Sequence, residues 1–109
     1  MAHNNWAIPS RFPTAPRVRA YRGMTCVPIS TGHASAVSRA ISASRFAPAS
    51  GWDVKVDRGR VVVRCGDHLS DRISAALNAG RYSYYSFGNG TDVHFFHVRG
   101  KYAPAPNPR

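Results

Sequence analysis

Residues 52–65 carry the clearest hydrophobic pattern in the chain, because apolar and polar side chains alternate on both sides of Arg58-Gly59. Alternation with a period of two predicts half-buried β-strands, and the Arg-Gly pair predicts a two-residue turn. The hairpin then places Asp53 opposite Arg64, and this pair of opposite charges favours the register. We expect one face of the hairpin to be buried, namely Trp52, Val54, Val56, Val61, Val63 and Cys65.

A second hairpin is predicted over residues 82–97, where Asn89-Gly90 is the strongest two-residue turn signal in the chain. This turn would pair Tyr85 with His94. Both faces of the hairpin carry aromatic side chains, and helices can cover only one face. We therefore expect aromatic rings to be exposed on the other face, unless the N-terminal arm or a second subunit covers them.

Two segments repeat apolar residues at helical spacing. The first predicts a helix over residues 33–45, with Ser30 or Thr31 as its cap. The second predicts a helix between Asp67, a good cap, and Gly80, a good stop. The expected buried stripes are Ala34, Val37, Ala40 and Ile41 in the first helix, and Leu69, Ile73, Ala76 and Leu77 in the second.

A short apolar run at residues 24–29 predicts the first strand, and Pro28 favours an edge position or the end of that strand. The order is then strand, helix, strand, strand, helix, strand, strand. The first six elements match the split β-α-β arrangement of ferredoxin-like α+β sandwiches, with two helices on one face of an antiparallel sheet. The seventh element is expected as an extra C-terminal edge strand.

The length predicts a single domain, which we place at residues 23–102. Residues 1–22 lack periodicity and are rich in proline and arginine, so we expect an extended basic arm. Residues 103–109 alternate proline with other residues and are expected to form an extended tail.

The charge pattern suggests the kind of partner. The chain has a net charge of +10, and no carboxylate precedes Asp53. Such a protein is attracted to nucleic acid or to acidic protein surfaces. Arginine, which dominates the basic residues, forms forked contacts with phosphate and carboxylate groups and stacks on flat rings.

The candidate contact residues come from the arm and from both hairpins. Phosphate or carboxylate groups would meet the cations, and bases would stack on the exposed rings. The alternative is an ordinary solvated strand face, partly neutralised by Asp53 and Asp57. The candidates are Arg17, Arg19, Arg22, Lys55, Arg58, Arg60, Arg64, Arg81, Tyr82, Tyr84, Tyr85, Phe95 and Arg99.

Catalytic and metal-binding patterns are absent from the sequence. It has no Gly-x-Ser-x-Gly motif, no phosphate-binding glycine loop and no CxxC or paired histidines at ligand spacing. We expect no enzyme activity, cofactor or metal. Cys26 and Cys65 are expected to be buried thiols, with a disulfide as the alternative. No apolar run is long enough to span a bilayer, so we expect a soluble, intracellular (cytoplasmic) protein.

Two functional hypotheses follow. The first is a small, basic, non-catalytic module that binds RNA or DNA. The alternative is a protein-interaction or assembly protein, such as a viral or phage structural component or a small inhibitor that docks on an acidic surface. In that case the N-terminal arm or a sheet edge could also join copies of the chain, and a viral protein would act inside the host cell.

Overall fold

The computed structural model describes residues 21–88 and 92–105. The elements follow the predicted order, with two short 3-10 turns (η) added at the helix starts. They are β1 (Met24–Pro28), η1 (Thr31–His33), α1 (Ala34–Ala43), β2 (Trp52–Asp57), β3 (Arg60–Gly66), η2 (Asp67–Leu69), α2 (Ser70–Ala79), β4 (Tyr82–Gly88) and β5 (Val93–Pro104).

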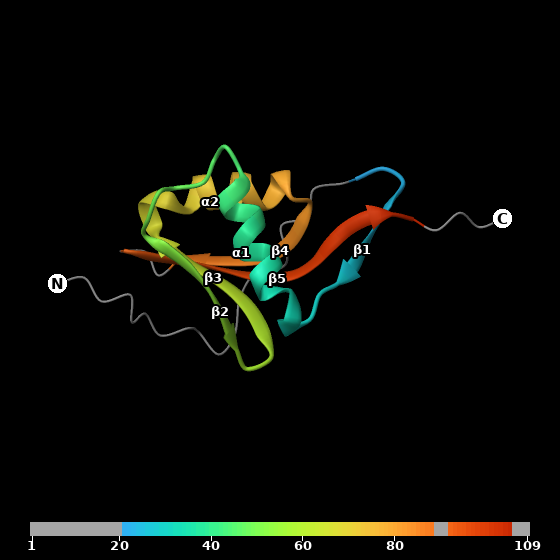
Figure 1. Cartoon of the computed structure of the whole chain (residues 1–109), viewed down its shortest axis with the longest axis horizontal. Coiled ribbons are helices and arrows are strands. Elements are labelled where there is room, and N and C mark those ends of the chain that lie inside the picture. Colours follow the sequence, from blue (N-terminus) through green and yellow to red (C-terminus); the bar gives the residue numbers. More distant parts are fainter. Residues whose placement is uncertain (1–20, 89–91, 106–109) are drawn as a thin grey trace.

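The five strands form one antiparallel sheet with the long strand β5 at its centre (Figure 1). Along one edge β5 pairs with β4. Along the opposite edge it pairs first with β3, over residues 93–98, and then with β1, over residues 100–104. The prediction of an extra C-terminal strand at the edge of the sheet was therefore wrong, because β5 has partners on both sides.

The ferredoxin-like strand order is not confirmed. A split β-α-β arrangement brings the first and third strands together as parallel neighbours, whereas β1 pairs with β5 in antiparallel fashion. β1 and β3 instead lie end to end along the same edge of β5. The coarser prediction, an α+β fold with two helices packed on an antiparallel sheet, is confirmed.

The β2–β3 hairpin has the predicted register, with Asp53 opposite Arg64 and Asp57 opposite Arg60. Its two turn residues both have positive φ, +52° at Arg58 and +75° at Gly59. Positive φ at both central positions matches the right-handed twist of the flanking strands. The features that predict this register are therefore all local to the hairpin.

The β4–β5 hairpin has a different register from the predicted one. Tyr85 lies opposite His97 instead of His94, a shift of three residues, and β5 begins only at Val93. Residues 89–91, which include the predicted turn, lie outside the described residues. Because side chains alternate between faces, an odd shift moves every side chain of one strand to the other face relative to its partner.

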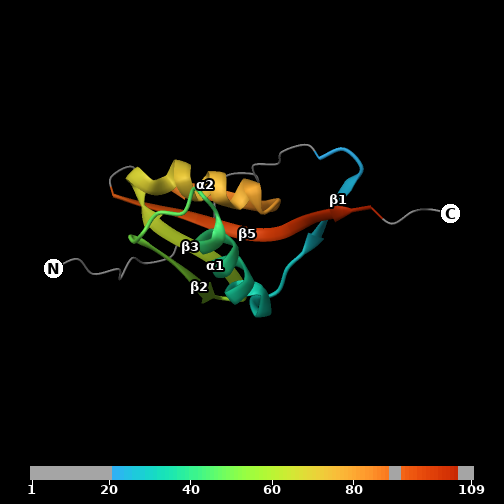
Figure 2. The same ribbon diagram turned by 45° about the horizontal axis from the view of Figure 1, so that its top comes forward.

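Both helices pack on one face of the sheet, which explains the main core. Figure 2 shows α2 running along β5, with β1 at the far end of that strand. The helices contribute Val37, Ile41, Ile73, Ala76 and Leu77, as predicted from their apolar stripes. The sheet contributes Val61, Val63, Cys65, Tyr82, Tyr84, Phe96 and Val98.

Candidate anion-binding surfaces

The basic face of the β2–β3 hairpin is largely neutralised. Arg64 donates two hydrogen bonds to Asp53, from Nε at 2.9 Å and from Nη2 at 2.6 Å, and it is buried. This hydrogen bonding raises the pKa of Arg64 against the opposing effect of burial. Arg60 forms an equally short pair with Asp57, at 2.6 Å. These two predicted contact residues therefore already have carboxylate partners within the sheet.

Lys55 and Arg58 of the same hairpin are exposed. Arg58 lies at the turn, where its nearest carboxylate oxygen, on Asp57, is 3.9 Å away. The two cations thus remain accessible, next to carboxylates that weaken the local positive field.

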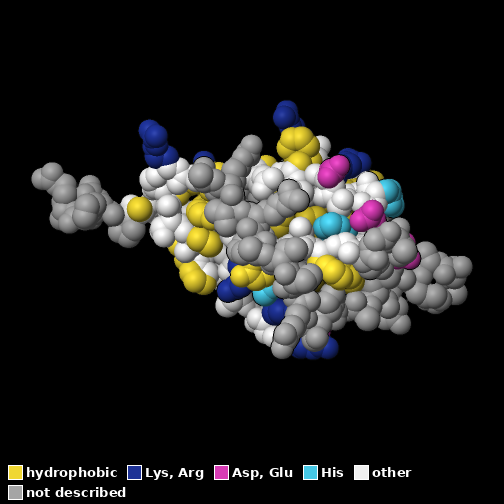
Figure 3. Space-filling model, turned by 180° about the vertical axis from the view of Figure 1, so that it is seen from behind, with side chains coloured by type: hydrophobic (Ala, Val, Ile, Leu, Met, Phe, Trp, Pro, Cys, Tyr) yellow, Lys and Arg dark blue, Asp and Glu magenta, His cyan; other side chains and the backbone are white. Residues whose placement is uncertain are grey.

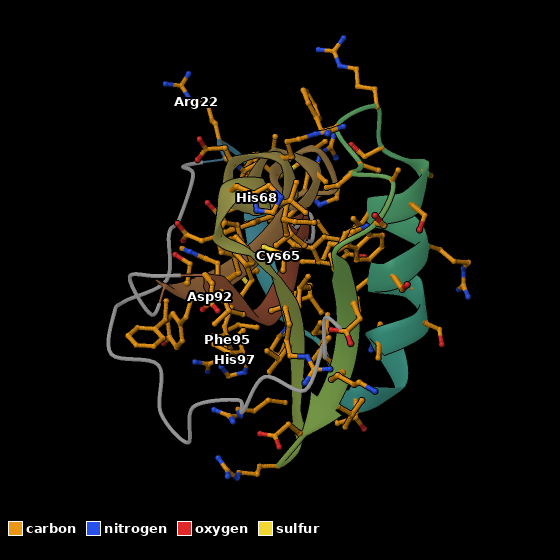
Figure 4. All side chains as sticks on the ribbon, turned by 90° about the vertical axis from the view of Figure 1, so that its left-hand side faces the viewer. Arg22, Cys65, His68, Asp92, Phe95 and His97 are labelled. Atoms are coloured by element: carbon orange, nitrogen blue, oxygen red, sulfur yellow. The ribbon has the colours of Figure 1, made fainter. Side chains whose placement is uncertain are left out.

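Three of the four predicted stacking rings are buried. Tyr82 and Tyr84 face the helices, and the Tyr84 hydroxyl is hydrogen-bonded to that of Ser74. Phe95 lies on the opposite face with only 2% of its surface exposed, in a small cluster with Val62 and Val93. Figure 4 shows Phe95 and His97 on the side of the sheet remote from α1. The exposure that base stacking requires is missing at all three rings.

Tyr85 is the fourth predicted ring, and it is partly exposed on the same face as Phe95. The Arg99 guanidinium carbon lies 4.9 Å from the centre of its ring, and the His97 ring packs edge-on at 5.8 Å. Burial, together with Arg99 and Arg60, lowers the pKa of His97 to about 4. The imidazole is therefore neutral near pH 7, and Arg99 is the cation at this position.

Two further predictions concern residues outside the described ranges. Arg17 and Arg19 belong to residues 1–20, and so does the segment of the N-terminal arm that was the alternative cover for the ring face. Tyr21 and Arg22, the last residues of the predicted arm, are described. Tyr21 contacts the domain, and Arg22 is exposed.

A pair of tyrosines at the far end of β5 was not predicted as a site. The rings of Tyr21 and Tyr102 are 4.8 Å apart, and the Tyr21 hydroxyl donates to the carbonyl of Asn78 at 3.3 Å. Tyr102 donates its backbone N–H to the carbonyl of Arg81 at 2.8 Å. These contacts bring together residues about 80 positions apart in sequence, so no local pattern could have indicated the pair.

Three exposed cations surround this pair, and we call the whole group the basic end: Tyr21, Arg22, Arg81, Lys101 and Tyr102. Within residues 21–88 and 92–105, Arg22, Arg81 and Lys101 form no ion pair. The Lys101 ammonium lies 5.4 Å from the centre of the Tyr82 ring. Cations that lack carboxylate partners retain their charge for an external anion.

Arg81 also has an unusual backbone conformation, with φ of +61°. It follows the end of α2, and its N–H donates to the carbonyl of Asn78 at 2.9 Å. This left-handed position is normally taken by glycine, and a residue with a Cβ is strained there. Gly80 comes one residue too early to take this position. A glycine is needed at position 80 for another reason, since a Cβ there would meet the Tyr82 ring at 2.8 Å. The strained position of Arg81 is a reason to look for a function of its side chain.

The carboxylates lie away from the basic end. Asp67, Asp71 and Asp92 gather where β5 begins, since Asp67 donates its N–H to the carbonyl of Asp92. The basic end lies at the other end of β5, which spans roughly 36 Å. On the face shown in Figure 3, acidic side chains are seen only in the half of the molecule remote from β1. The described part of the molecule is therefore electrically polarised along β5.

The acidic region contains the one described group that resembles catalytic machinery. Asp67 Oδ1 lies 3.3 Å from His94 Nδ1. His94 also lines a polar hollow of about 100 Å³ together with Ser70, Asp71, Ser74, Tyr84, Ser86 and Phe96.

The two cysteines differ from the prediction of two buried thiols. Cys65 is buried, and burial, followed in effect by the charge of Asp67, raises its pKa to about 12. Cys26 is exposed, and both thiols are free. The described residues contain no group of three metal-ligating side chains.

Comparisons with protein-family models, with curated proteins and with solved structures gave no match for this chain. None of the helices within the described ranges has the length and apolar character needed to cross a membrane.

Proposed function

We propose that this protein is a small, non-catalytic module that binds nucleic acid at the basic end. The supporting observation is that three exposed cations, which have no carboxylate partner among the described residues, lie next to an aromatic pair. Arg22, Arg81 and Lys101 contact phosphates, and the Tyr21–Tyr102 pair offers a ring surface to a base. Arg99 above Tyr85 provides a second, smaller contact of the same type.

Most of the affinity in this mode comes from the phosphate backbone. Each contact between a cation and a phosphate releases condensed counterions, so affinity falls steeply as salt rises and depends little on sequence. Stacking of one base on an aromatic side chain adds about 1–3 kcal/mol. A single-stranded ligand is favoured because its bases can reach the tyrosines without the breaking of any base pair.

The test is binding of mixed-sequence single-stranded RNA and DNA across a salt series, measured by fluorescence anisotropy. We expect the affinity of the whole chain to fall as salt rises, with a slope that reports several phosphate contacts. Binding that does not respond to salt, or the absence of binding at low salt, would contradict the proposal.

Two arginines provide a matched pair of variants. Arg81 and Arg58 are both exposed and both have positive φ, so a change to glycine removes the same charge and relieves similar strain in each. Arg81→Gly should weaken binding of a single strand roughly fivefold at 0.1 M salt and reduce the salt slope. Arg58→Gly should have a much smaller effect.

The stability of these variants separates function from folding. Both should be as stable as the wild type or more so, because glycine adopts positive φ without strain. If the measured stability of Arg81→Gly equals that of the wild type, weaker binding by this variant is not a result of unfolding. If Arg58→Gly has the larger effect on binding, the contact surface is the β2–β3 hairpin instead of the basic end.

A protein-interaction or assembly role is the second candidate, and one observation favours it. Among the described strands, β1 pairs only with β5, so its outer edge is available to a further strand. Size-exclusion chromatography with light scattering tests the assembly form of this role. A defined oligomer supports it, and a monomer at all concentrations contradicts it.

A further inference from the structure

We infer that the outer edge of β1 binds an extended, acidic segment of another protein by strand addition. This inference concerns a different partner from the nucleic-acid proposal and does not depend on that proposal, although Lys101 and Tyr102 of the basic end also line the groove used here. Three features carry it: the hydrogen-bonding groups of the edge, the apolar groove beside it and the charges around both.

The backbone of β1 presents hydrogen-bonding groups on its outer side. Ile29 donates its N–H to the carbonyl of Arg99 at 3.1 Å, and Gly23 accepts from Ala105 at 2.9 Å. In an antiparallel pair, residues that bond to the partner alternate with residues that point away from it. The groups that point outward therefore belong to Met24, Cys26 and Pro28.

Pro28 limits how a strand can be added. Proline has no N–H. Pro28 lies at an outward position, where the missing N–H leaves the pairing with β5 intact. An added strand can accept a hydrogen bond from the Cys26 N–H and donate to the carbonyls of Met24, Cys26 and Pro28. This short ladder fits a peptide segment of a few residues.

An apolar groove of about 320 Å³ begins at β1 and extends over the face of the sheet between β1, β5 and the start of α1. Val27 lines it and is 47% exposed, a large fraction for a valine in a strand. The groove can receive alternate side chains of an added strand, which provide specificity in this binding mode. Its lining is Val27, Pro28, Ile29, His33, Ala36, Tyr82, Lys101, Tyr102 and Ala103.

The charge around the groove selects the occupant. Lys101 lines the groove and Arg22 precedes β1, whereas the carboxylates of the described residues lie on β2 and at the start of β5. An acidic segment therefore meets complementary charge here. Neither terminal segment of this chain supplies one, because residues 1–22 and 103–109 contain no aspartate or glutamate. The occupant is accordingly a segment of another protein with alternating acidic and apolar residues.

The edge strand β2 gives a comparison within the same molecule. It also pairs with a single strand and exposes a valine, Val56, at 52%. β2 carries Asp53 and Asp57, however, which lie next to Lys55 and Arg58 and weaken the attraction of this edge for an acidic segment. Val27 and Val56 are thus a matched pair of exposed valines, and carboxylates lie near Val56 but not near Val27 in the described residues.

The test uses a fluorescently labelled, end-blocked octapeptide of alternating glutamate and valine, with lysine in place of glutamate in the control peptide. We expect the whole chain to bind the acidic peptide and not the basic one. Val27→Asp and Lys101→Glu should each weaken binding of the acidic peptide at least tenfold. Val56→Asp makes the same chemical change as Val27→Asp on the other edge, and it should leave binding within twofold.

Amide exchange gives a readout that does not depend on side-chain charge. The acidic peptide should slow hydrogen exchange at the Cys26 amide, because that N–H becomes a donor to the added strand. Protection at Cys26 together with loss of binding in Val27→Asp supports the inference. Equal effects of Val27→Asp and Val56→Asp, no change at Cys26, or no binding of the acidic peptide would each overturn it.

The same variants tested with a single-stranded oligonucleotide keep the two proposals apart. Val27→Asp places a carboxylate opposite Lys101, so it should also weaken oligonucleotide binding. Arg81→Gly removes a cation that does not line the groove, so it should weaken oligonucleotide binding and leave binding of the acidic peptide within twofold. If Val27→Asp selectively reduces oligonucleotide binding and leaves peptide binding unchanged, the groove serves nucleic acid and the inference is wrong.

Discussion

The two halves of β5 have different surroundings although they belong to one continuous strand. Residues 93–98 lie between β3 and β4, and Phe95, Phe96 and Val98 there are each 2% exposed. Residues 100–104 pair with the exposed strand β1 and lie next to the basic end. The first half is packed as core, whereas the second half presents cations, a tyrosine pair and an open sheet edge.

This difference separates stability from binding. The core half depends on packing, where the removal of a few atoms is costly. The exposed half depends on charge and on backbone groups that remain available, where single substitutions change stability little. The packed first half of β5 continues into the second half, where Tyr21 from the N-terminal part of the chain lies against Tyr102.

The largest expected difference between the two halves is in stability. Phe96→Ala should reduce the free energy of unfolding by about 3–5 kcal/mol, because the ring packs edge-on against Tyr84 in the closed core. Val27→Ala in the paired strand β1 should change it by less than about 0.5 kcal/mol. Urea unfolding followed by circular dichroism measures both. Similar losses in the two variants would contradict the division of β5.

A smaller loss in the free energy of unfolding is expected from a substitution in the β2–β3 hairpin, which pairs with the core half of β5. Asp53→Asn should cost about 2 kcal/mol, because it removes the carboxylate that accepts two hydrogen bonds from the buried Arg64. Asp71→Asn, at an exposed aspartate in the first turn of α2, is the control and should cost well under 1 kcal/mol. Equal costs in urea unfolding would mean that Arg64 readily finds another partner.

His97 gives the core half a pH dependence. Its pKa is lowered to about 4 in the folded state by burial, by Arg99 and by Arg60. The unfolded chain takes up the proton near pH 6.5, so the contribution of His97 to stability is present above pH 6.5 and is lost as pH falls toward 4. The loss of stability between pH 6.5 and 4 should be smaller in His97→Gln than in the wild type. NMR titration of the His97 ring provides the direct measurement, and an ordinary midpoint there would contradict the prediction.

The two thiols test the same difference between the exposed and the packed part of the sheet through their reactivity instead of through the stability of a variant. Cys26 in β1 is exposed, whereas Cys65 in β3 is buried with a pKa of about 12. A thiol reagent at pH 8 should modify one cysteine per folded chain and two per unfolded chain. Cys26→Ser should abolish the reaction of the folded chain. Rapid modification of Cys65 in that variant would show that the core half opens readily.

The two hairpins show which strand registers could be predicted from the sequence. The β2–β3 register followed from an Arg-Gly turn and from two pairs of opposite charges, all local features. The β4–β5 register could not be obtained in this way, because aromatic residues on both faces of the hairpin fit either pairing. The packing of Phe96 and Val98 against the helices instead matches the observed register, in which Tyr85 faces His97.

The candidate site was predictable only in part. The exposed positions of Arg22, Lys55, Arg58, Arg81 and Arg99 agree with the contact residues chosen from the sequence. The burial of Tyr82, Tyr84 and Phe95 and the pairing of Arg60 and Arg64 depend on which face each side chain occupies. The Tyr21–Tyr102 pair depends on contacts between distant parts of the chain.

The sequence by itself determined the order of helices and strands, the apolar stripes of both helices, the first hairpin and the positive charge. Each of these depends on neighbours within a few residues, or on composition. Only the tertiary structure decided the central position of β5, the face on which each aromatic ring lies and the segregation of Arg81 from the carboxylates. These features arise from contacts between residues that are far apart in the chain, such as Tyr21 with Tyr102, and such contacts leave no local signal in the sequence.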